Sequence, residues 1–261
     1  MQPLSAQLCT TQSVMKDLHD LGICPGDTVL LHSSLRSMGY VVGGAEAIVT
    51  AFLQVLGEQG TLVVPTHTSE NSEPSEWQEP PVPESWWQEI RDHTPAFDPT
   101  KSKTRQMGAI PEMARTWPGS VRSDHPQTSF AAIGRLASRI TANHALDCRL
   151  GEQSPLAKLE ECNAKVVLLG VDYGSCTASH LAEYRIGRPM VENWFAAVID
   201  GRRQWVTVKD TRIDGDFAEL GEPFEAAYKV VKGRVGAATS RVFSVRDAVT
   251  FAADWLTNNR R

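Results

Sequence analysis

The sequence has no run of about 18 consecutive apolar residues, the minimum for a helix that spans a membrane. Residues 1–11 also lack a basic stretch followed by an apolar one, so no secretory signal peptide is visible. We therefore expect a protein that has no membrane partner.

Cysteine is scarce and irregularly placed, with five residues and no Cys-x-x-Cys pair. An odd number of scattered cysteines indicates reduced thiols in a cytoplasmic protein and argues against a disulfide framework. Without Cys-x-x-Cys spacing, a structural zinc site is not expected. The five residues are Cys9, Cys24, Cys148, Cys162 and Cys176.

Excess positive charge is absent too, because 26 Lys and Arg face 31 Asp and Glu, for a formal net charge of −5. This balance argues against nucleic acid and anionic membranes, and it is compatible with cationic ligands. We see no internal repeat and no obvious linker, and 261 residues can bury one full core. The sequence therefore predicts a single domain over residues 1–261.

The hydrophobic pattern alternates between short buried strands and amphipathic helices. Residues 28–31 form an apolar strand, residues 43–56 a helix, and residues 61–64 a second strand. A strand-helix-strand unit predicts an α/β fold whose mixed, largely parallel central sheet is flanked by helices. Later, Asp200-Gly201 separates two strand-like runs and predicts a hairpin, and residues 244–258 predict a final helix.

A long insertion, residues 66–104, interrupts this pattern. It contains six prolines and three tryptophans, and residues 69–92 hold seven acidic side chains against the single base Arg91. Loops of this length in a compact domain are usually functional or disordered. Two interpretations stay open: a solvated acidic flap, or a negative rim that attracts cations to a cleft.

The segment 169–183 is the strongest candidate for a catalytic centre. A buried strand over residues 164–169 runs into a polar turn, and Thr177 is expected to cap the following helix. Thr177, His180 and Glu183 recur every three residues, so they share one helix face. A hydroxyl can donate to an oxyanion, and an imidazole can take a proton near neutral pH.

Several motifs occur in a fixed order and together resemble the aminoglycoside 3-N-acetyltransferase family, which does not use the GNAT fold. The resemblance covers residues 12–258. Its motifs are HSSLRSMG (32–39), GG (43–44), GTLVVPT (60–66), FDP (97–99), RSDHP (122–126) with Ser129, GEQSPL (151–156), LLGV (168–171) and Thr177-x-x-His180-x-x-Glu183.

The resemblance implies acetyl transfer from acetyl-CoA to the 3-amino group of a 2-deoxystreptamine aminoglycoside, which confers resistance, by a monomer or homodimer without a metal. It implies that His180 is a general base near Thr177, with Asp210 or Asp214 as its carboxylate partner and Glu183 in reserve. Residues expected to bind the cofactor are His32, Ser33, Ser34, Leu35, Arg36, Ser37, Gly108, Arg122, Ser123 and Ser129. Residues expected to bind the aminoglycoside are Glu70, Asp98, Asp172 and Tyr173.

Other functions remain to be compared with this one. Cys176 and His180 could form a thiol hydrolase. A metal-dependent hydrolase could use residues at one sheet edge, namely His32, His67, Asp98, His125 and His180. The acceptor could be a different amine, or the protein could sequester a cationic ligand without turning it over.

Overall fold

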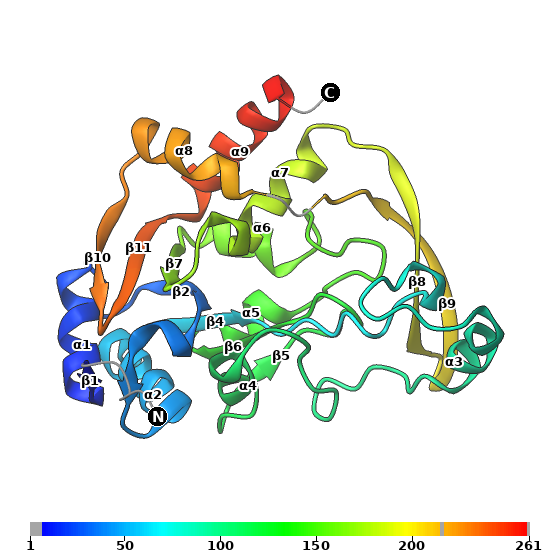
Figure 1. Cartoon of the computed structure of the whole chain (residues 1–261), viewed down its shortest axis with the longest axis horizontal. Helices are drawn as coiled ribbons and strands as arrows, with labels where there is room; N and C mark the ends of the chain where they lie inside the picture. Colours follow the sequence, from blue (N-terminus) through cyan, green and yellow to red (C-terminus); the bar gives the residue numbers. More distant parts are fainter. Residues whose placement is uncertain (1–6, 215–216, 260–261) are drawn as a thin grey trace.

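The computed structural model describes residues 7–214 and 217–259. Its centre is a seven-stranded sheet with the order β10-β11-β7-β2-β4-β6-β5 (Figure 1). These strands are β10 (Val231–Val235), β11 (Ala238–Ser244), β7 (Lys165–Leu169), β2 (Thr28–Ser33), β4 (Thr61–Pro65), β6 (Phe130–Gly134) and β5 (Val121–Arg122).

The sheet is mixed. Strands β7, β2 and β4 are hydrogen-bonded in parallel, whereas β10–β11, β11–β7, β4–β6 and β5–β6 are antiparallel pairs. Five of the seven strands, β10, β7, β2, β4 and β5, consequently run in one direction. This confirms the predicted mixed, largely parallel sheet, although parallel pairing is confined to its centre.

Helices cover both faces of the sheet, which explains why consecutive residues in the middle of the central strands are apolar. Val29 and Leu31 of β2 pack in one hydrophobic cluster with α1, α2 and α4, while Leu30 packs in a second cluster with α5, α6, α7, α8 and α9. The bounds are α1 (Thr11–Asp20), α2 (Gly44–Leu56), α4 (Ala109–Arg115), α5 (Ala137–Thr141), α6 (Pro155–Glu161), α7 (His180–Arg185), α8 (Gly221–Ala227) and α9 (Val245–Asn259).

The predicted hairpin is present but stands apart from the central sheet. Strands β8 (Met190–Ile199) and β9 (Arg202–Thr211) form a two-stranded sheet of their own, turning at Asp200 and Gly201, both with positive φ. It projects to one side of the molecule, as Figure 1 shows. Another two-stranded sheet, β1 (Leu8–Cys9) with β3 (Tyr40–Val41), is too short to be seen in the sequence pattern.

The last two strands of the chain form the hairpin β10–β11, which turns at Gly236 with φ +58°. A Cβ on Gly236 would lie 2.6 Å from the carbonyl oxygen of Met38, so only glycine fits this turn. Single-turn elements complete the described chain: η1 (Leu35–Met38), η2 (Pro74–Glu76), η3 (Glu84–Trp86), η4 (Tyr173–Ser175), η5 (Thr177–Ser179) and η6 (Ala218–Leu220).

The insertion 66–104 is ordered, with α3 (Trp87–His93) beside the far end of the β8–β9 hairpin (Figure 1). Glu73 is buried and forms a two-point ion pair with Arg91, with distances of 2.5 Å to Nη2 and 3.0 Å to Nε. At least one carboxylate of the expected acidic flap is therefore neutralised inside it.

A buried amide joins the insertion to the hairpin. Asn71 donates from Nδ2 to the Ala196 carbonyl at 2.9 Å and accepts from the Ala196 N–H at 2.7 Å. This pair of bonds imitates the pairing of a neighbouring strand. Within the residues described, no helix combines the length and apolar character needed to cross a membrane. All five cysteines are free thiols.

Asn71→Ala should lower the stability of the protein by about 2–3 kcal/mol, because it leaves two buried backbone groups of Ala196 without partners. Thermal unfolding followed by circular dichroism measures the effect. Asn258→Ala is the matched control, since the Asn258 amide bonds an exposed helix carbonyl. Equal melting temperatures for both variants would contradict the role of Asn71.

Candidate active site

The central motif forms a strand, two short turns and a helix at the carboxyl edge of the sheet. After β7, the turns η4 and η5 lead into α7, which begins at His180. Thr177 lies inside η5 and does not cap α7; the N-cap position belongs to Ser179, whose side chain makes no capping bond. The expectation that Thr177 caps the helix was therefore wrong, because a second turn intervenes. Its hydroxyl forms no hydrogen bond to any other residue that the structure describes.

His180 is paired with Glu183. The His180 Nδ1 lies 2.7 Å from Glu183 Oε2, and the carboxylate is fully buried while the imidazole keeps 15% exposure. With an ionised carboxylate on Nδ1, the proton of the neutral ring resides on that nitrogen and Nε2 has the free lone pair. The arrangement is therefore that of an oriented base.

The surroundings of the pair fix it on both sides. Glu183 Oε1 accepts a hydrogen bond from the Asp214 N–H at 2.9 Å, which ties the chain after the hairpin to α7. The His180 ring meets Phe217 edge-on, with ring centres 5.0 Å apart. Both contacts hold the imidazole in one orientation.

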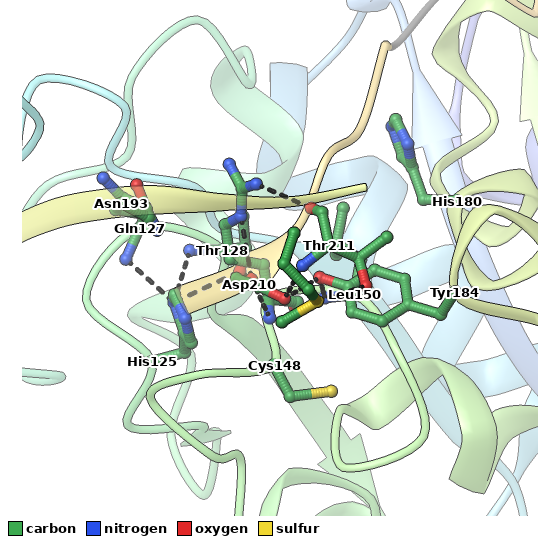
Figure 2. A network of polar contacts seen from close by, with 12 residues as sticks. His125, Gln127, Thr128, Cys148, Leu150, His180, Tyr184, Asn193, Asp210 and Thr211 are labelled. Atoms are coloured by element: carbon green, nitrogen blue, oxygen red, sulfur yellow. Dashed lines mark hydrogen bonds and ion pairs between the residues drawn. The ribbon is translucent and has the colours of Figure 1, made fainter. Parts of the chain in front are cut away.

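Asp210, one of the two expected partners of His180, belongs to a separate buried network (Figure 2). Its carboxylate accepts bonds from the Arg149 side chain at 3.0 Å, the Tyr184 hydroxyl at 2.8 Å and the Thr211 N–H at 2.7 Å. Figure 2 shows His180 to one side of these contacts, with no bond joining it to Asp210. Asp210 is fully buried and is satisfied by these donors.

Asp214, the other expected partner, forms ion pairs with Arg188 and Arg212. These guanidinium groups hold the pKa of the Asp214 carboxyl below its ordinary value, chiefly through the Arg188 hydrogen bond. Only its backbone reaches the pair, through Glu183. The expectation that Asp210 or Asp214 pairs with His180 thus fails, and the reserve candidate Glu183 takes that position.

A groove of about 540 Å³ lies beyond the end of β2. It brings together five of the expected cofactor residues: Ser33, Ser34, Leu35, Arg36 and Gly108. The groove also reaches Gly44 at the start of α2, where a helix of 13 residues presents free backbone N–H groups. The Ser33 hydroxyl is buried and has no partner among the described atoms.

Three other expected cofactor residues are internal. Arg122 is buried and donates to the hydroxyls of Thr66 and Ser129 and to the carbonyls of Thr66, Pro99 and Ser102. Burial lowers the pKa of Arg122 to about 10. Its donors hold the insertion to the residues that follow β4 and precede β6, so they are not available to bind the cofactor.

The Ser123 hydroxyl is likewise bonded to residues inside the protein. It accepts from the Phe130 N–H at 2.9 Å and lies 3.0 Å from His144 Nδ1, while His144 Nε2 reaches the Arg149 carbonyl at 2.8 Å. His125, beside His144, accepts two backbone N–H bonds at Nδ1. These contacts make a structural network next to the site. Ser37 lies close to the groove described above but lines a neighbouring one of about 580 Å³.

The expected substrate residues are dispersed. Glu70 lines a pocket of about 750 Å³ under the insertion, together with Trp77, Glu79 and Arg105. Asp98 binds its own turn at Thr100, which lowers the pKa of its carboxyl to about 2. Asp172 lines the groove that contains Ser37. The fourth residue, Tyr173, is buried against Phe243 and bonds Glu225.

One residue that the sequence did not single out connects two of these cavities. Gln106 lines both the groove at β2 and the pocket under the insertion, and it adopts φ +58°. A positive φ costs a non-glycine residue energy and often occurs at functional sites. The only sequence signal is its place two residues before Gly108, so pattern reasoning could not have found it.

The geometry does not favour a thiol hydrolase or a metal-dependent hydrolase. Cys176 is buried, and burial raises the pKa of its thiol, whereas His180 is bonded to Glu183. A thiol that stays protonated is a poor nucleophile. Over the described residues, no group of three or more His, Cys, Asp or Glu side chains is placed to hold a metal ion.

Comparison with known proteins shows which family has this architecture. The family model for aminoglycoside 3-N-acetyltransferases matches residues 30–257. The SPbeta prophage-derived aminoglycoside N(3')-acetyltransferase-like protein YokD of Bacillus subtilis is 45% identical over 96% of this chain and 93% of its own. Aminoglycoside N(3)-acetyltransferase VII of Streptomyces paromomycinus is 35% identical over 95% and 91%.

Solved structures of proteins from the same family have the same fold. The crystal structure of YokD superposes with a TM-score of 0.94, at 43% identity and covering 96% of this chain and 94% of that one. AAC-IIIb with CoASH gives 0.85 at 29% identity over 96% and 97%. AAC-VIa bound to sisomicin gives 0.85 at 30% identity over 95% and 97%. The chain therefore belongs to the aminoglycoside 3-N-acetyltransferase family.

Proposed function

We propose that the protein transfers the acetyl group of acetyl-CoA to the 3-amino group of a 2-deoxystreptamine aminoglycoside in the cytoplasm and so confers resistance. The observation that carries the proposal is the His180–Glu183 pair, with 2.7 Å between Nδ1 and Oε2 at the carboxyl edge of the sheet. A base of this kind suits amine acylation, because an ammonium group must lose its proton before it can attack.

In the proposed reaction, the free amine attacks the thioester carbon while His180 Nε2 takes a proton from its nitrogen. The C–N bond forms, the C–S bond breaks, and the proton passes from the imidazolium to the sulfur of CoA. Glu183 stabilises the imidazolium without taking the proton, as the carboxylate of a catalytic triad does. Thr177, three residues before His180, supplies a hydroxyl for the developing oxyanion.

The groove beyond β2 fits acetyl-CoA. The buried, unpartnered Ser33 hydroxyl supplies a polar contact for an amide-containing chain. Side chains at Gly44 and Gly108 would meet nothing within 4 Å, so the glycines leave space along the groove. Arg36 and the N–H groups of α2 suit phosphate oxygens. AAC-IIIb, a structural relative, binds CoASH.

The pocket under the insertion is the candidate acceptor site, since Gln106 joins it to the groove. Glu70, Glu79 and the aromatic Trp77 suit an amino sugar, and the relative AAC-VIa binds sisomicin. However, Glu70 is paired with Arg105 at 2.8 Å, and Lys103 also lines the pocket. Because the pocket is not uniformly negative, acetylation of an amine with fewer positive charges is the second candidate.

Release of free thiol from acetyl-CoA should follow addition of an aminoglycoside that has a 3-amino group, and mass spectrometry should show one added acetyl group. A thiol-reactive dye measures the rate across a panel of aminoglycosides and simple amines, with acetyl-CoA alone as the blank. Turnover of simple amines only would favour the second candidate. Binding of aminoglycosides with no thiol release would indicate a sequestering protein.

Glu183→Gln should lower kcat by about 10²–10⁴-fold with little change in either KM, because it removes the anion that supports the imidazolium. Asp210→Asn should lower thermal stability instead, since Arg149 loses its buried anion at a cost of about 3–5 kcal/mol. Rate and melting temperature are measured for both variants. Wild-type kcat in Glu183→Gln, together with loss of turnover in a stably folded Asp210→Asn, would reverse the assignment.

A further inference from the structure

Three histidines gather at the carboxyl edge of the central strands. His32 is the last residue but one of β2, before Ser33, His67 follows β4 by two residues, and His180 begins α7. Their charges interact, because a positive His180 disfavours protonation of both other rings, and His32 does the same to His67. The three residues therefore lie at one edge of the sheet, and the proposed mechanism uses only His180.

The register of β2 places His32 on the same side of the sheet as α7. His32 is opposite Leu168 of β7, whose side chain packs with Leu30 in the cluster that includes α7. Ser33 is opposite Leu169, which packs in the other cluster, and Ser33 lines the proposed CoA groove. At the end of β2, Ser33 therefore faces the groove, and the preceding residue, His32, lies on the side of the sheet that carries His180.

His67 reaches the same edge of the sheet from the acceptor side. Its ring meets Phe130 edge-on at 5.6 Å between centres, and Phe130 belongs to the same cluster as α7. The next residues, Thr68, Ser69 and Glu70, line the pocket under the insertion. His32 is therefore adjacent in sequence to the cofactor groove, and His67 to the acceptor pocket.

The Nε2 atoms of His32 and His67 are buried and have no hydrogen-bond partner among the described atoms. His32 as a whole is 5% exposed. Buried polar atoms are nearly always satisfied, and each one left unpaired costs about 1–3 kcal/mol. Of the other buried imidazoles, His144 uses both of its ring nitrogens, whereas His125 uses Nδ1 and its Nε2 also lacks a partner among the described atoms. The unpaired nitrogens beside the base therefore indicate groups reserved for a ligand.

The two rings are also uncharged at neutral pH, because burial lowers the pKa of each to about 3. A neutral imidazole can hydrogen-bond a carbonyl oxygen as an electrophile, as in triosephosphate isomerase, where a neutral histidine polarises the substrate carbonyl. Such a ring does not compete with His180 for the proton of the amine. It can serve only as a donor or acceptor at a fixed position.

We propose that His32 is a further catalytic residue, whose Nε2–H donates a hydrogen bond to the oxygen of the acetyl group as the amine adds to the thioester. The bond strengthens as the carbonyl π electrons move onto oxygen, and it returns to its initial strength when the C–S bond breaks. This inference rests on the proposed acetyl transfer. His67, on the acceptor side, contacts the amine substrate instead.

The test compares His32→Leu, which removes the donor, with His32→Gln, whose amide nitrogen reaches the same position as Nε2. Acetyl-CoA labelled with ¹³C at the carbonyl is bound without acceptor, and isotope-edited infrared spectroscopy measures the C=O stretch. The wild-type protein should shift the stretch to lower frequency than in water. His32→Leu should lose that shift, and His32→Gln should restore most of it.

Kinetics supply the second readout. His32→Leu should lower kcat by about 10²–10³-fold, the usual cost of an oxyanion donor, while the Kd of acetyl-CoA stays near the wild-type value. His67→Leu, the matched comparison, should leave the carbonyl frequency unchanged and raise the KM of the acceptor. Circular dichroism verifies that each variant is folded.

A carbonyl frequency in folded His32→Leu that equals the wild-type value, with acetyl-CoA bound, would overturn the assignment of His32 and leave acetyl transfer intact. A carbonyl shift that disappears in His67→Leu but not in His32→Leu would exchange their roles and also overturn it. Failure of the wild-type protein to bind acetyl-CoA would instead contradict the proposed function itself. The infrared measurement therefore separates the two proposals.

Discussion

Glu183 has no exposure to solvent, and its charge needs partners inside the protein. A buried carboxylate is stable only when hydrogen bonds or opposite charges replace its water. Its two oxygens take the His180 ring and the backbone N–H of Asp214. The first contact orients the imidazole, and the second fixes where the chain that leaves the β8–β9 hairpin must return to α7. One carboxylate therefore joins the helix of the central motif to the segment that follows the β8–β9 hairpin.

The hairpin and the insertion depend on a second set of polar contacts. Asn71 binds the backbone of β8, Gln127 bonds the backbone of Asn71 and Trp194, and Asn193 donates to Gln127. Arg122 fastens the other end of the insertion to β4 and β6. Amides and a guanidinium define direction more strictly than apolar packing does. The insertion and the hairpin are therefore held by directional bonds, although they lie outside the central sheet.

Local signals in the sequence were sufficient for much of the fold. Alternating apolar strands and amphipathic helices predicted the central sheet, and Asp200-Gly201 predicted the β8–β9 turn. The three-residue spacing in α7 also placed His180 and Glu183 on one face, because neighbours on a helix are fixed by its geometry alone. Membership in the family followed from motifs in a fixed order.

Contacts between segments that are distant in the sequence could not be predicted from such local signals. The family resemblance implied Asp210 or Asp214 as the partner of His180, yet Asp210 is bonded to Arg149 and Tyr184, 61 and 26 residues away. Arg122 carried a charge suited to phosphate, but its surroundings of carbonyls and hydroxyls became visible only in three dimensions. The unpaired nitrogens of His32 and His67 have no sequence signature at all, since burial depends on the whole fold.

Four histidines whose rings are buried also determine how the protein responds to acid. Burial lowers the pKa of His32 and His67 to about 3, that of His144 to about 4, and that of His125 well below the ordinary value of 6.5. Above pH 6.5 these rings are neutral in both folded and unfolded chains, so folding is unaffected. As the pH falls below 6.5, these rings bind protons in the unfolded chain but not in the folded one. Each ring then removes about 1.4 kcal/mol of stability per pH unit until its folded pKa is reached. Imidazoles that the fold holds in the neutral form thus limit its stability to near-neutral conditions.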